Sequence, residues 1–385
     1  MEIISNATFF LLLFILAGWI YRSWRSLSEL KQAPTLKLTE SASRQGKVSI
    51  LIPVKNEETN IANCVKPLLV QLREGDELLI INNCSEDRTE AVLKELGAVE
   101  IRSEDPPARS HAKFKYLNTP STPVEWTGKN FALHLGIEHV TGDWLFFTDA
   151  DTRHEPGSLN IALAFAEERK LDLLTLLPRC LAHGFWEEVI QPCMMGYMGL
   201  WFPVQKINDP KSKVYFGNGQ YLLIRAEHYR RIGGHEDVKE AFLEDFALMK
   251  KTKETGARGM CAFGVEIYGT RMYESLGAIW RGWRRIFLHA FEQKPATILR
   301  CALSVFFFSV FPFIVLATLP QSFSLALLLC VFILVIIFAT AATAYAIVRA
   351  RKRYALFHPL AALVFTAILL DAFQMALLKR RTHWR

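Results

Sequence analysis

The sequence predicts an α/β protein in which a mostly parallel sheet, flanked by helices, is joined to membrane helices. Three observations lead to this prediction. Short apolar runs alternate with helical patterns between residues 47 and 304, an arrangement typical of parallel sheets covered on both faces. The hydrophobic residues, 51% of the 385-residue chain, concentrate in a short N-terminal run and a long C-terminal block, as in membrane proteins. Polar clusters follow three of the apolar runs directly.

The N-terminal run predicts a membrane anchor. Ile3 to Tyr21 is almost entirely apolar and is just long enough to cross a bilayer. Positive charge follows the run, at Arg22 and Arg25, whereas a cleaved signal peptide carries it before the run. We therefore expect residues 1–24 to be a retained anchor in the cell membrane. Its N-terminus would lie outside and the following domain in the cytoplasm.

Strands and helices then alternate. We expect strands at 48–52, 78–81, 99–102 and 144–148, and helices at 57–72 and 86–96. Pro53 ends the first strand, and Asn56 and Ser85 are candidate helix caps. Ligands of such sheets bind beyond the carboxyl ends of the strands. The polar clusters at 53–57, 82–87 and 149–151 are therefore expected to converge on one edge.

The rest of the predicted catalytic domain, 25–296, is less regular. Residues 185–202 are rich in Met, Trp and Phe, a composition that fits either a core helix or a helix facing lipid. Residues 215–224 resemble a strand interrupted by Gly217, Asn218 and Gly219, where backbone can approach a ligand closely. A helix is expected at 243–255.

The C-terminal region, 297–385, predicts two or three further membrane helices. Residues 301–319 and 323–348 are spanning candidates joined by a short uncharged linker, 320–322, which favours a helical hairpin. Residues 358–378 form a third candidate, carrying Asp371. Three full spans would place the cationic residues 379–381 outside, against the positive-inside bias. We therefore favour a re-entrant or interfacial last segment.

Charge and cysteine content exclude other classes. The net charge of +7 is explained by cationic flanks of the apolar runs, which contact anionic lipid. No aromatic and basic nucleic-acid module is present, so nucleic acid is not an expected partner. The seven cysteines contain no CxxC pair, which argues against zinc and against a disulfide framework.

Asp149 and Asp151 are the clearest candidate site residues. They follow an apolar strand, and because successive side chains in a strand alternate, both project to the same side. Two hard oxygen donors of this kind can hold a divalent cation against a diphosphate. The alternative is that both are turn or cap residues.

Five motifs, taken together, resemble the family 2 glycosyltransferases, which have the GT-A fold. They occur in that family's order and rough spacing: Pro53 to Glu57, Asn82 to Asp87, Trp126 to Lys129, Asp149 to Asp151, and Glu244 with Asp245. A basic Trp-rich helix, Trp280 to Arg285, precedes the C-terminal apolar block, as in that family. Details around Gly233, His235 and Tyr273 are most similar to membrane-bound enzymes that glycosylate carotenoid acids, with hopanoid-associated relatives behind them.

The resemblance implies a nucleotide-sugar donor and a metal, Mg²⁺ or Mn²⁺, which neutralises the diphosphate leaving group. Asp151 is then the metal ligand, with Asp149 nearer the ribose or a metal-bound water. Pro53 and Glu57, at the end of the first strand, would belong to the donor site, where Glu57 meets the ribose or base. Asn82 would touch the base, and Lys129 would interact with the diphosphate. The alternatives are a helix N-terminal carboxylate for Glu57 and a solvated side chain for Lys129.

The resemblance also implies that Asp245 is the base of an inverting single displacement. Its alternative, shared with Glu244, is an ordinary acidic residue at a helix N-terminus. Trp283 and Arg284 would close over the donor together with Trp280 and Arg285. The same helix is also typical of an interfacial amphipathic segment, and the two roles are compatible.

Two departures from the family pattern matter. Asn82 stands where the family commonly has Asp, which puts the base preference in doubt. The basic Trp helix also differs from the Gln-x-x-Arg-Trp form of processive synthases, and few spans are present. We therefore expect transfer of one sugar to a lipidic acceptor of carotenoid, hopanoid or polyprenyl type. A processive polysaccharide synthase and an inactive membrane scaffold are the alternatives. The sequence leaves the sugar, the nucleotide and the oligomeric state open.

Overall fold

The computed structural model describes residues 2–38, 43–104, 112–318 and 324–379. Contacts divide the chain into two compact units. The sheet unit consists of residues 33–179 and 204–271, and the helical unit of 1–32, 180–203 and 272–383. The predicted domain boundaries at 24 and 296 remain a prediction, and each unit is described by itself.

The sheet unit is built on eight strands in the order β10-β7-β9-β5-β1-β2-β4-β3. All neighbours pair in parallel except β9, which runs antiparallel to both β5 and β7. This confirms the predicted mostly parallel sheet. The strands are β1 Val48–Val54, β2 Glu77–Asn82, β3 Val99–Ile101, β4 Phe114–Asn118, β5 Trp144–Phe147, β7 Leu173–Leu177, β9 Leu222–Arg225 and β10 Gly259–Phe263. Short β6 Thr152–His154 pairs antiparallel with β11 Tyr268–Thr270, and β8 is Arg179–Cys180.

Helices cover both faces of this sheet because its strands are apolar on both sides. Ile50 and Ile52 of β1 pack with residues of α2, whereas Leu51 packs with residues of α4 on the opposite face, as the alternation of a strand requires. The helices of this unit are α2 Ile61–Leu69, α3 Thr89–Glu95, α4 Gly128–Ile137, α5 Ser158–Glu168, α7 Val204–Asn208, α8 Ala226–Arg231, the 3₁₀ turn Glu236–Val238, and α9 Glu244–Glu254.

Three local predictions were wrong. β1 continues one residue past Pro53, because a proline removes one donor without preventing parallel pairing at the strand end. Asn56 and Ser85 cap no helix: Ser85 Oγ accepts the N–H of Asn56, and Asn56 Oδ1 accepts the N–H of Glu86, each within 2.9 Å. The two side chains join the loops after β1 and β2 to each other instead. The segment 215–221 is a loop, and the strand begins only at Leu222.

The helical unit contains the apolar segments. Its elements are α1 Glu2–Gln32, α6 Phe185–Trp201, α10 Leu276–Ala290, α11 Pro295–Val305, a π-helical turn Phe306–Val310, α12 Phe311–Thr318, α13 Leu325–Ile347, the 3₁₀ turn Lys352–Phe357, and α14 His358–Leu377. Among the described residues, three helical segments are long and apolar enough to cross a membrane: Pro295–Thr318, Leu325–Ile347 and Lys352–Leu377. The expected linker of the hairpin, 320–322, lies outside the described residues.

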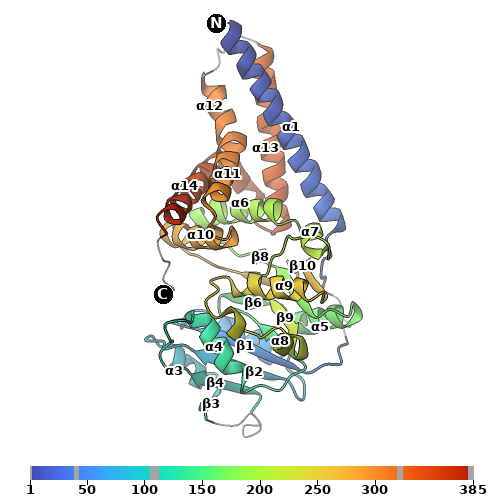
Figure 1. Ribbon diagram of the computed structural model, residues 1–385, viewed down its shortest axis with the longest axis vertical. Helices are drawn as coiled ribbons and strands as arrows, with labels where there is room; N and C mark the ends of the chain where they lie inside the picture. The colour runs from blue at the N-terminus through green and yellow to red at the C-terminus, as the bar shows by residue number, and fades with distance from the viewer. Residues whose placement is uncertain (1, 39–42, 105–111, 319–323, 380–385) are drawn as a thin grey trace. The chain divides into compact units, whose positions relative to one another are not determined.

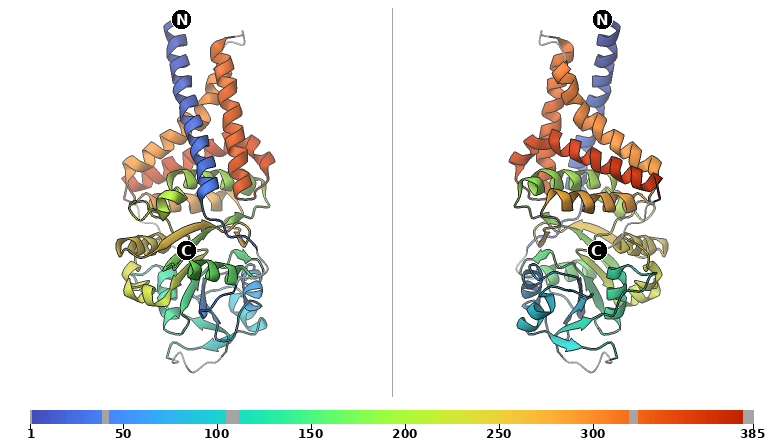
Figure 2. Two further views of the ribbon diagram at one scale, coloured as in Figure 1. Left: turned by 90° about the vertical axis from the view of Figure 1, so that its right-hand side faces the viewer. Right: turned by 90° about the vertical axis from the view of Figure 1, so that its left-hand side faces the viewer.

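The N-terminal run is helical as predicted, since it forms α1, but its crossing of a membrane remains a prediction. Figure 1 shows α1 alongside α13, and the two helices pack against each other. α14 packs instead on α11, α10 and α6, and Figure 2 shows it running across the direction of α1 and α13. This direction is compatible with a helix that lies in the membrane interface. The interfacial position of the last segment nevertheless remains a prediction.

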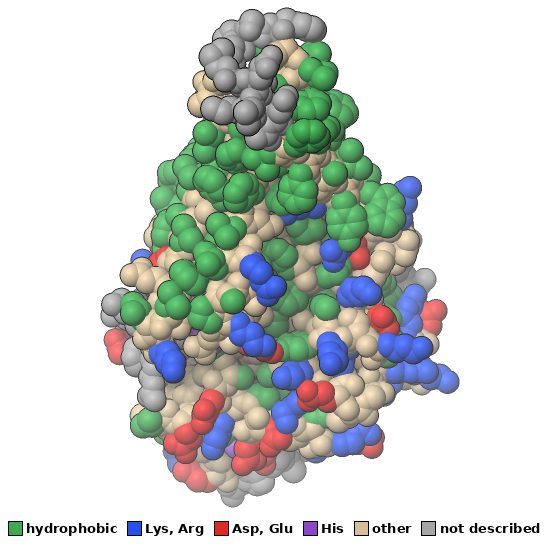
Figure 3. Space-filling model, turned by 45° about the horizontal axis from the view of Figure 1, so that its top comes forward, with side chains coloured by type: hydrophobic (Ala, Val, Ile, Leu, Met, Phe, Trp, Pro, Cys, Tyr) green, Lys and Arg blue, Asp and Glu red, His purple; other side chains and the backbone are tan. Residues whose placement is uncertain are grey.

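Apolar side chains cover much of the outer surface of the helical unit. Figure 3 shows this surface as a broad field of hydrophobic side chains. The exposed residues include Phe10 and Phe14 of α1, and Phe332 and Val335 of α13. An apolar surface of this size is what lipid contact requires.

Candidate active site

The loops that follow β1 and β5 carry acidic residues to the carboxyl edge of the sheet. In the register of β1 with β2, Val54 is paired with Asn82, so both strands end at the same level. Glu57 follows β1 closely, and Asp149 follows β5. Because β1, β2 and β5 pair in parallel, the polar clusters that follow them lie at the same, carboxyl edge of the sheet, as predicted.

Lys129 is the centre of the charged cluster. It lies in the first turn of α4, which Thr127 caps by accepting the N–H of Asn130 at 3.3 Å. Its Nζ lies 2.8 Å from a carboxylate oxygen of Asp149 and 2.8 Å from one of Glu244. Burial alone would lower the pKa of Lys129, but the surrounding carboxylates outweigh it and raise the pKa. The lysine is thus firmly charged and is not an ordinary solvated side chain.

Asp245 lies in the first turn of α9. The backbone of residues 217–219, which we call the glycine loop, approaches it closely. Its Oδ2 accepts the N–H of Gly219 at 2.6 Å, and its Oδ1 accepts the N–H of Phe246 at 2.8 Å. Burial raises the pKa of Asp245 to about 7, with a further contribution from the adjacent Glu244. A carboxyl group in this range can exchange a proton near neutral pH.

Glycine at 217 and 219 is what permits this approach. A Cβ on Gly217 would lie 2.1 Å from the backbone oxygen of Asp245, and one on Gly219 would lie 2.8 Å from Lys129 Nζ. The close approach seen here is to the protein's own Asp245 and Lys129, and the expected approach of this backbone to a ligand remains a prediction. The loop packs directly on the charged cluster.

Asp151 has spare hydrogen-bonding capacity. Its Oδ1 is shielded from solvent and has no hydrogen-bond partner among the described residues. Burial, followed by the negative charges of Asp149 and Glu57, raises the pKa of Asp151 to about 8. A buried carboxylate oxygen without a donor is unfavourable by itself, and a bound cation would satisfy it.

Glu57 lies near the acidic pair, and Asn82 ends β2, on the side of β1 away from β5. Burial raises the pKa of Glu57, while a hydrogen bond from Asn60 acts in the opposite direction. Asn82 donates from Nδ2 to Asn118 Oδ1 at 2.7 Å, and its own Oδ1 is buried without a partner among the described residues. One amide oxygen therefore remains available to a ligand. Pro53 is partly buried within β1.

Trp283 and Arg284 belong to the helical unit, whereas the other predicted site residues belong to the sheet unit. Trp283 is only 3% exposed and stacks on Phe287, with 5.4 Å between ring centroids. Arg284 forms an ion pair with Asp371 at 2.9 Å. Their proposed closure over a donor remains a prediction.

Glu244 is the site residue that sequence reasoning missed. Its position beside Asp245 on a helix suggested that it points elsewhere, since adjacent residues are about 100° apart. The structure places it 6% exposed, against Lys129. The partner is 115 residues away in the sequence, and the only available signal was a second acidic residue in the first turn.

The donor set fits a divalent cation held jointly with a ligand. No group of three or more His, Cys, Asp or Glu side chains forms a ready-made metal cage in the part of the chain that the structure describes. Asp149 and Asp151 nevertheless offer hard oxygen atoms, and the unpartnered Asp151 Oδ1 is suitable for a cation. Mg²⁺ in particular is commonly bound by one or two carboxylates together with substrate phosphates.

Comparison with known proteins agrees with this geometry. Residues 49–232 match the family model of glycosyl transferase family 2. The 4,4'-diaponeurosporenoate glycosyltransferase of Staphylococcus aureus strain USA300 is 22% identical over 258 residues, which cover 66% of this chain and 63% of that protein. The protein of strain MRSA252 is 23% identical over the same length and coverage. The alignment thus spans less than two thirds of the length of these curated relatives.

The mannosyltransferase PcManGT of Pyrobaculum calidifontis, solved with GDP-Man and Mn²⁺, has a similar fold. The TM-score is 0.53 at 16% sequence identity, and the match covers 97% of this chain and 100% of that one. The matched family region contains Lys129, Asp149 and Asp151, while Asp245 lies beyond it. Residues 49–232 therefore match a glycosyl transferase family 2 domain, and the mixed, mostly parallel GT-A-like sheet agrees with this match.

Proposed function

We propose that the protein is an inverting glycosyltransferase that moves one sugar from a nucleotide-sugar donor to a lipidic acceptor at the membrane. The observation that carries the proposal is the cluster around Lys129. There Asp149 and Glu244 contact the amine, Asp245 lies beside them, and Asp151 keeps a buried oxygen without a partner. Buried carboxylates outnumber the single lysine in this cluster, which is unfavourable for the protein alone. A divalent cation bound together with a diphosphate would balance the excess negative charge.

Asp149 and Asp151 would hold Mg²⁺ or Mn²⁺. When bound, the metal stabilises negative charge on the diphosphate as a Lewis acid. Lys129 would interact with the same phosphates, and the 2.8 Å between its Nζ and Asp149 supports this role. The side-chain amide oxygen of Asn82 and the carboxyl group of Glu57 would bind the base and the ribose. Pro53 would contact the donor beside them.

Asp245 would act as the base. The acceptor hydroxyl oxygen attacks the anomeric carbon, its proton passes to the Asp245 carboxylate, and the electron pair of the breaking bond leaves with the nucleoside diphosphate. A single displacement of this kind inverts the configuration. The N–H of Gly219 fixes the orientation of the carboxylate at 2.6 Å, so the base does not have to be ordered when the acceptor binds.

The acceptor is proposed to be a lipid of carotenoid, hopanoid or polyprenyl type. Two observations support this class: the three candidate spans and apolar surface of the helical unit, and the similarity to an enzyme named for a carotenoid acid. We further propose a multi-pass protein of the cell membrane with its sheet unit in the cytoplasm. Trp283 and Arg284 would complete the donor site from the helical unit.

The test is transfer of labelled sugar into the organic-soluble fraction of membranes that contain the full-length protein. Wild-type protein should add one hexose to an extracted lipid, detected by mass spectrometry, and Asp245→Asn should abolish the product. Asp237→Asn is the control, because Asp237 is an exposed acidic residue that forms an ion pair with Lys251. Full activity in Asp245→Asn would disprove the proposed base, and a ladder of products would indicate a polymerising enzyme.

A further inference from the structure

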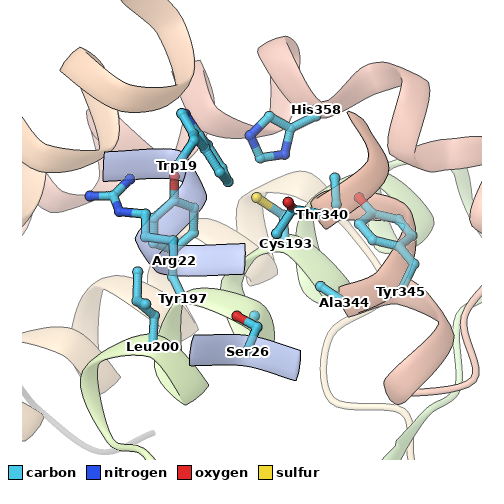
Figure 4. Close-up of a pocket in the computed structure, with 12 residues that line it drawn as sticks. Trp19, Arg22, Ser26, Cys193, Tyr197, Leu200, Thr340, Ala344, Tyr345 and His358 are labelled. Carbon is cyan, nitrogen blue, oxygen red and sulfur yellow. The ribbon is translucent and has the colours of Figure 1, made fainter. Parts of the chain in front are cut away.

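The helical unit contains a partly open cavity of about 60 Å³ that has no role in the proposed sugar transfer. We call it the membrane cavity. Its walls come from four helices, α1, α6, α13 and α14, and include Trp19, Arg22, Cys193, Gly196, Thr340 and His358. Figure 4 shows His358 and Trp19 at one end, Ser26 and Leu200 at the other, and Cys193 between them.

His358 is buried in the wall of this cavity without a polar partner. Its side chain is 4% exposed, and neither ring nitrogen has a hydrogen-bond partner among the described residues. The nearest ring contact is the indole of Trp19, edge-on at 6.2 Å between centroids. Buried polar groups are normally hydrogen-bonded, so an imidazole of this kind at a cavity indicates a missing ligand.

The cavity is electropositive. Among its twelve lining residues there is one arginine, Arg22, and no aspartate or glutamate. Arg22 donates from Nη2 to Ser304 Oγ at 2.7 Å, and its guanidinium lies 3.8 Å from the centre of the Phe308 ring. Its Nη1 is buried and has no partner, and no carboxylate pairs with it in the described parts of the chain. The charge therefore lacks a counterion.

At His358 the 3₁₀ turn Lys352–Phe357 continues directly into α14. The backbone N–H of His358 already donates to the carbonyl oxygen of Ala355, and the next residue is a proline without an N–H. His358 therefore offers its ring, and not its backbone, to the cavity. A guanidinium without a counterion and an imidazole without a hydrogen-bond partner thus line one cavity within the described helices, and together they favour a negatively charged ligand.

Most of the other lining residues are small or apolar, and the hydroxyl groups of Tyr197 and Tyr345 are already bonded, to the Ser309 hydroxyl and to the backbone oxygen of Val189. Gly196 of α6 faces Ala344 of α13, and a Cβ on the glycine would lie 3.3 Å from the Ala344 Cβ. Leu200 and Ala341 complete an apolar wall. A ligand that satisfies both parts has an anionic group and an apolar body, which is the chemistry of a lipid.

We propose that the membrane cavity binds the phosphate headgroup of one lipid molecule, with Arg22 and His358 as its hydrogen-bond donors. The acyl or isoprenoid chain leaves along the apolar surface of α1 and α13. Two sources share this chemistry, a glycerophospholipid and a polyprenyl phosphate. None of the cavity residues belongs to the proposed active site, so lipid binding stands or falls separately from sugar transfer.

The test is native mass spectrometry of the full-length protein in detergent, titrated with phosphatidylglycerol, with a polyprenyl phosphate, or with zwitterionic phosphatidylcholine. Wild-type protein should retain one copy of at least one of the two anionic lipids in preference to phosphatidylcholine, whose phosphate is neutralised by its own choline group. The lipid that displaces the other at lower concentration identifies the source. Arg22→Met and His358→Phe should each weaken binding by about tenfold or more, since each removes a buried donor to an anion.

Arg25→Met is the matched control, because it removes a cation from the same helix outside the cavity. Gly196→Val fills the cavity without touching either donor, and it keeps the test decisive if Arg22→Met does not fold. Asp245→Asn should bind lipid like the wild type even though transfer is lost. Equal retention of phosphatidylcholine, or unchanged binding in both His358→Phe and Gly196→Val, would overturn the proposal.

Discussion

The carboxylate of Asp371 lies 2.9 Å from the guanidinium of Arg284, and the same oxygen accepts the indole N–H of Trp280 at 2.7 Å. Asp371 is the only acidic residue in the three candidate spans. Ionisable residues in such segments are costly unless they are paired. The amphipathic helix α10 and the last apolar helix α14 are therefore joined by a polar contact, which fixes the orientation of two residues of the Trp-rich helix.

This contact can be measured by a double-mutant cycle. Asp371→Asn and Arg284→Met should each lower the thermal stability of the detergent-solubilised protein. Their combined effect should be smaller than the sum, with a coupling of ~1 kcal/mol for a pair about a quarter exposed. Strictly additive effects on the unfolding temperature would show that the two residues do not interact.

Transfer should depend on pH through Asp245. Burial raises the pKa of this carboxyl to about 7, and only its deprotonated form can accept the proton of the acceptor hydroxyl. Activity should therefore fall as the pH drops below about 7 and level off above it. Measured as kcat/KM against pH, the profile should move to lower pH in Glu244→Gln, because the adjacent like charge is removed. A profile without this acidic limb would rule out Asp245 as the base.

Chelation should abolish transfer, and Mg²⁺ or Mn²⁺ should restore it. Asp151→Asn should need a higher metal concentration for half-maximal rate, since it removes a hard oxygen ligand. Binding of Mn²⁺ to the protein with nucleoside diphosphate, followed by electron paramagnetic resonance, provides a readout independent of turnover. Asp237→Asn is again the surface control. Full activity in excess chelator would contradict the assignment of Asp149 and Asp151.

Replacing Lys129 should destabilise the sheet unit in a pH-dependent way. In Lys129→Met the carboxylates of Asp149 and Glu244 lose their cation, and breaking a buried ion pair costs about 3–5 kcal/mol. The positive charge of Lys129 also lowers the pKa values of the neighbouring Asp151 and Asp245, which burial raises, so without the lysine both pKa values rise further in the folded state. Protonation of these carboxyls stabilises the fold at low pH, and this contribution is lost as the pH rises.

Thermal unfolding in chelator should therefore show a larger deficit at high pH than at low pH. Lys251→Met is the matched control, since that lysine forms a more exposed pair with Asp237. An equal deficit at all pH values would mean that Lys129 acts by packing alone.

Part of the sheet was predictable because several buried strands are apolar runs with their own stop signals. The strands at Ile50 and Leu79 are apolar on both faces, and Asp149 follows a strand whose burial is evident from Trp144 to Phe147. Because parallel strands end at one edge, the polar clusters after these three strands were expected there without coordinates. The strands β4, β7 and β10 were not predicted, and Lys129, in the first turn of α4, was assigned only from the family resemblance.

Contacts between distant segments were not predictable. Asn56 and Ser85 each have the composition of a helix cap, and only the closeness of two loops in the fold turns them toward each other. Glu244 was similar, since its partner Lys129 comes from another helix. Local propensity describes what a side chain can do, whereas tertiary packing selects its partner.

The two glycines beside Asp245 give a practical criterion for sequence surveys. Any other residue at position 219 would displace the Lys129 amine, and any at 217 would collide with the backbone at the start of α9. In a homologue that keeps every acidic motif but has alanine at these positions, the side chains around Lys129 and Asp245 should be displaced, and sugar transfer should be lost. Glycine at both places therefore separates working enzymes from degenerate copies better than the short acidic motifs do, because those motifs arise readily by chance.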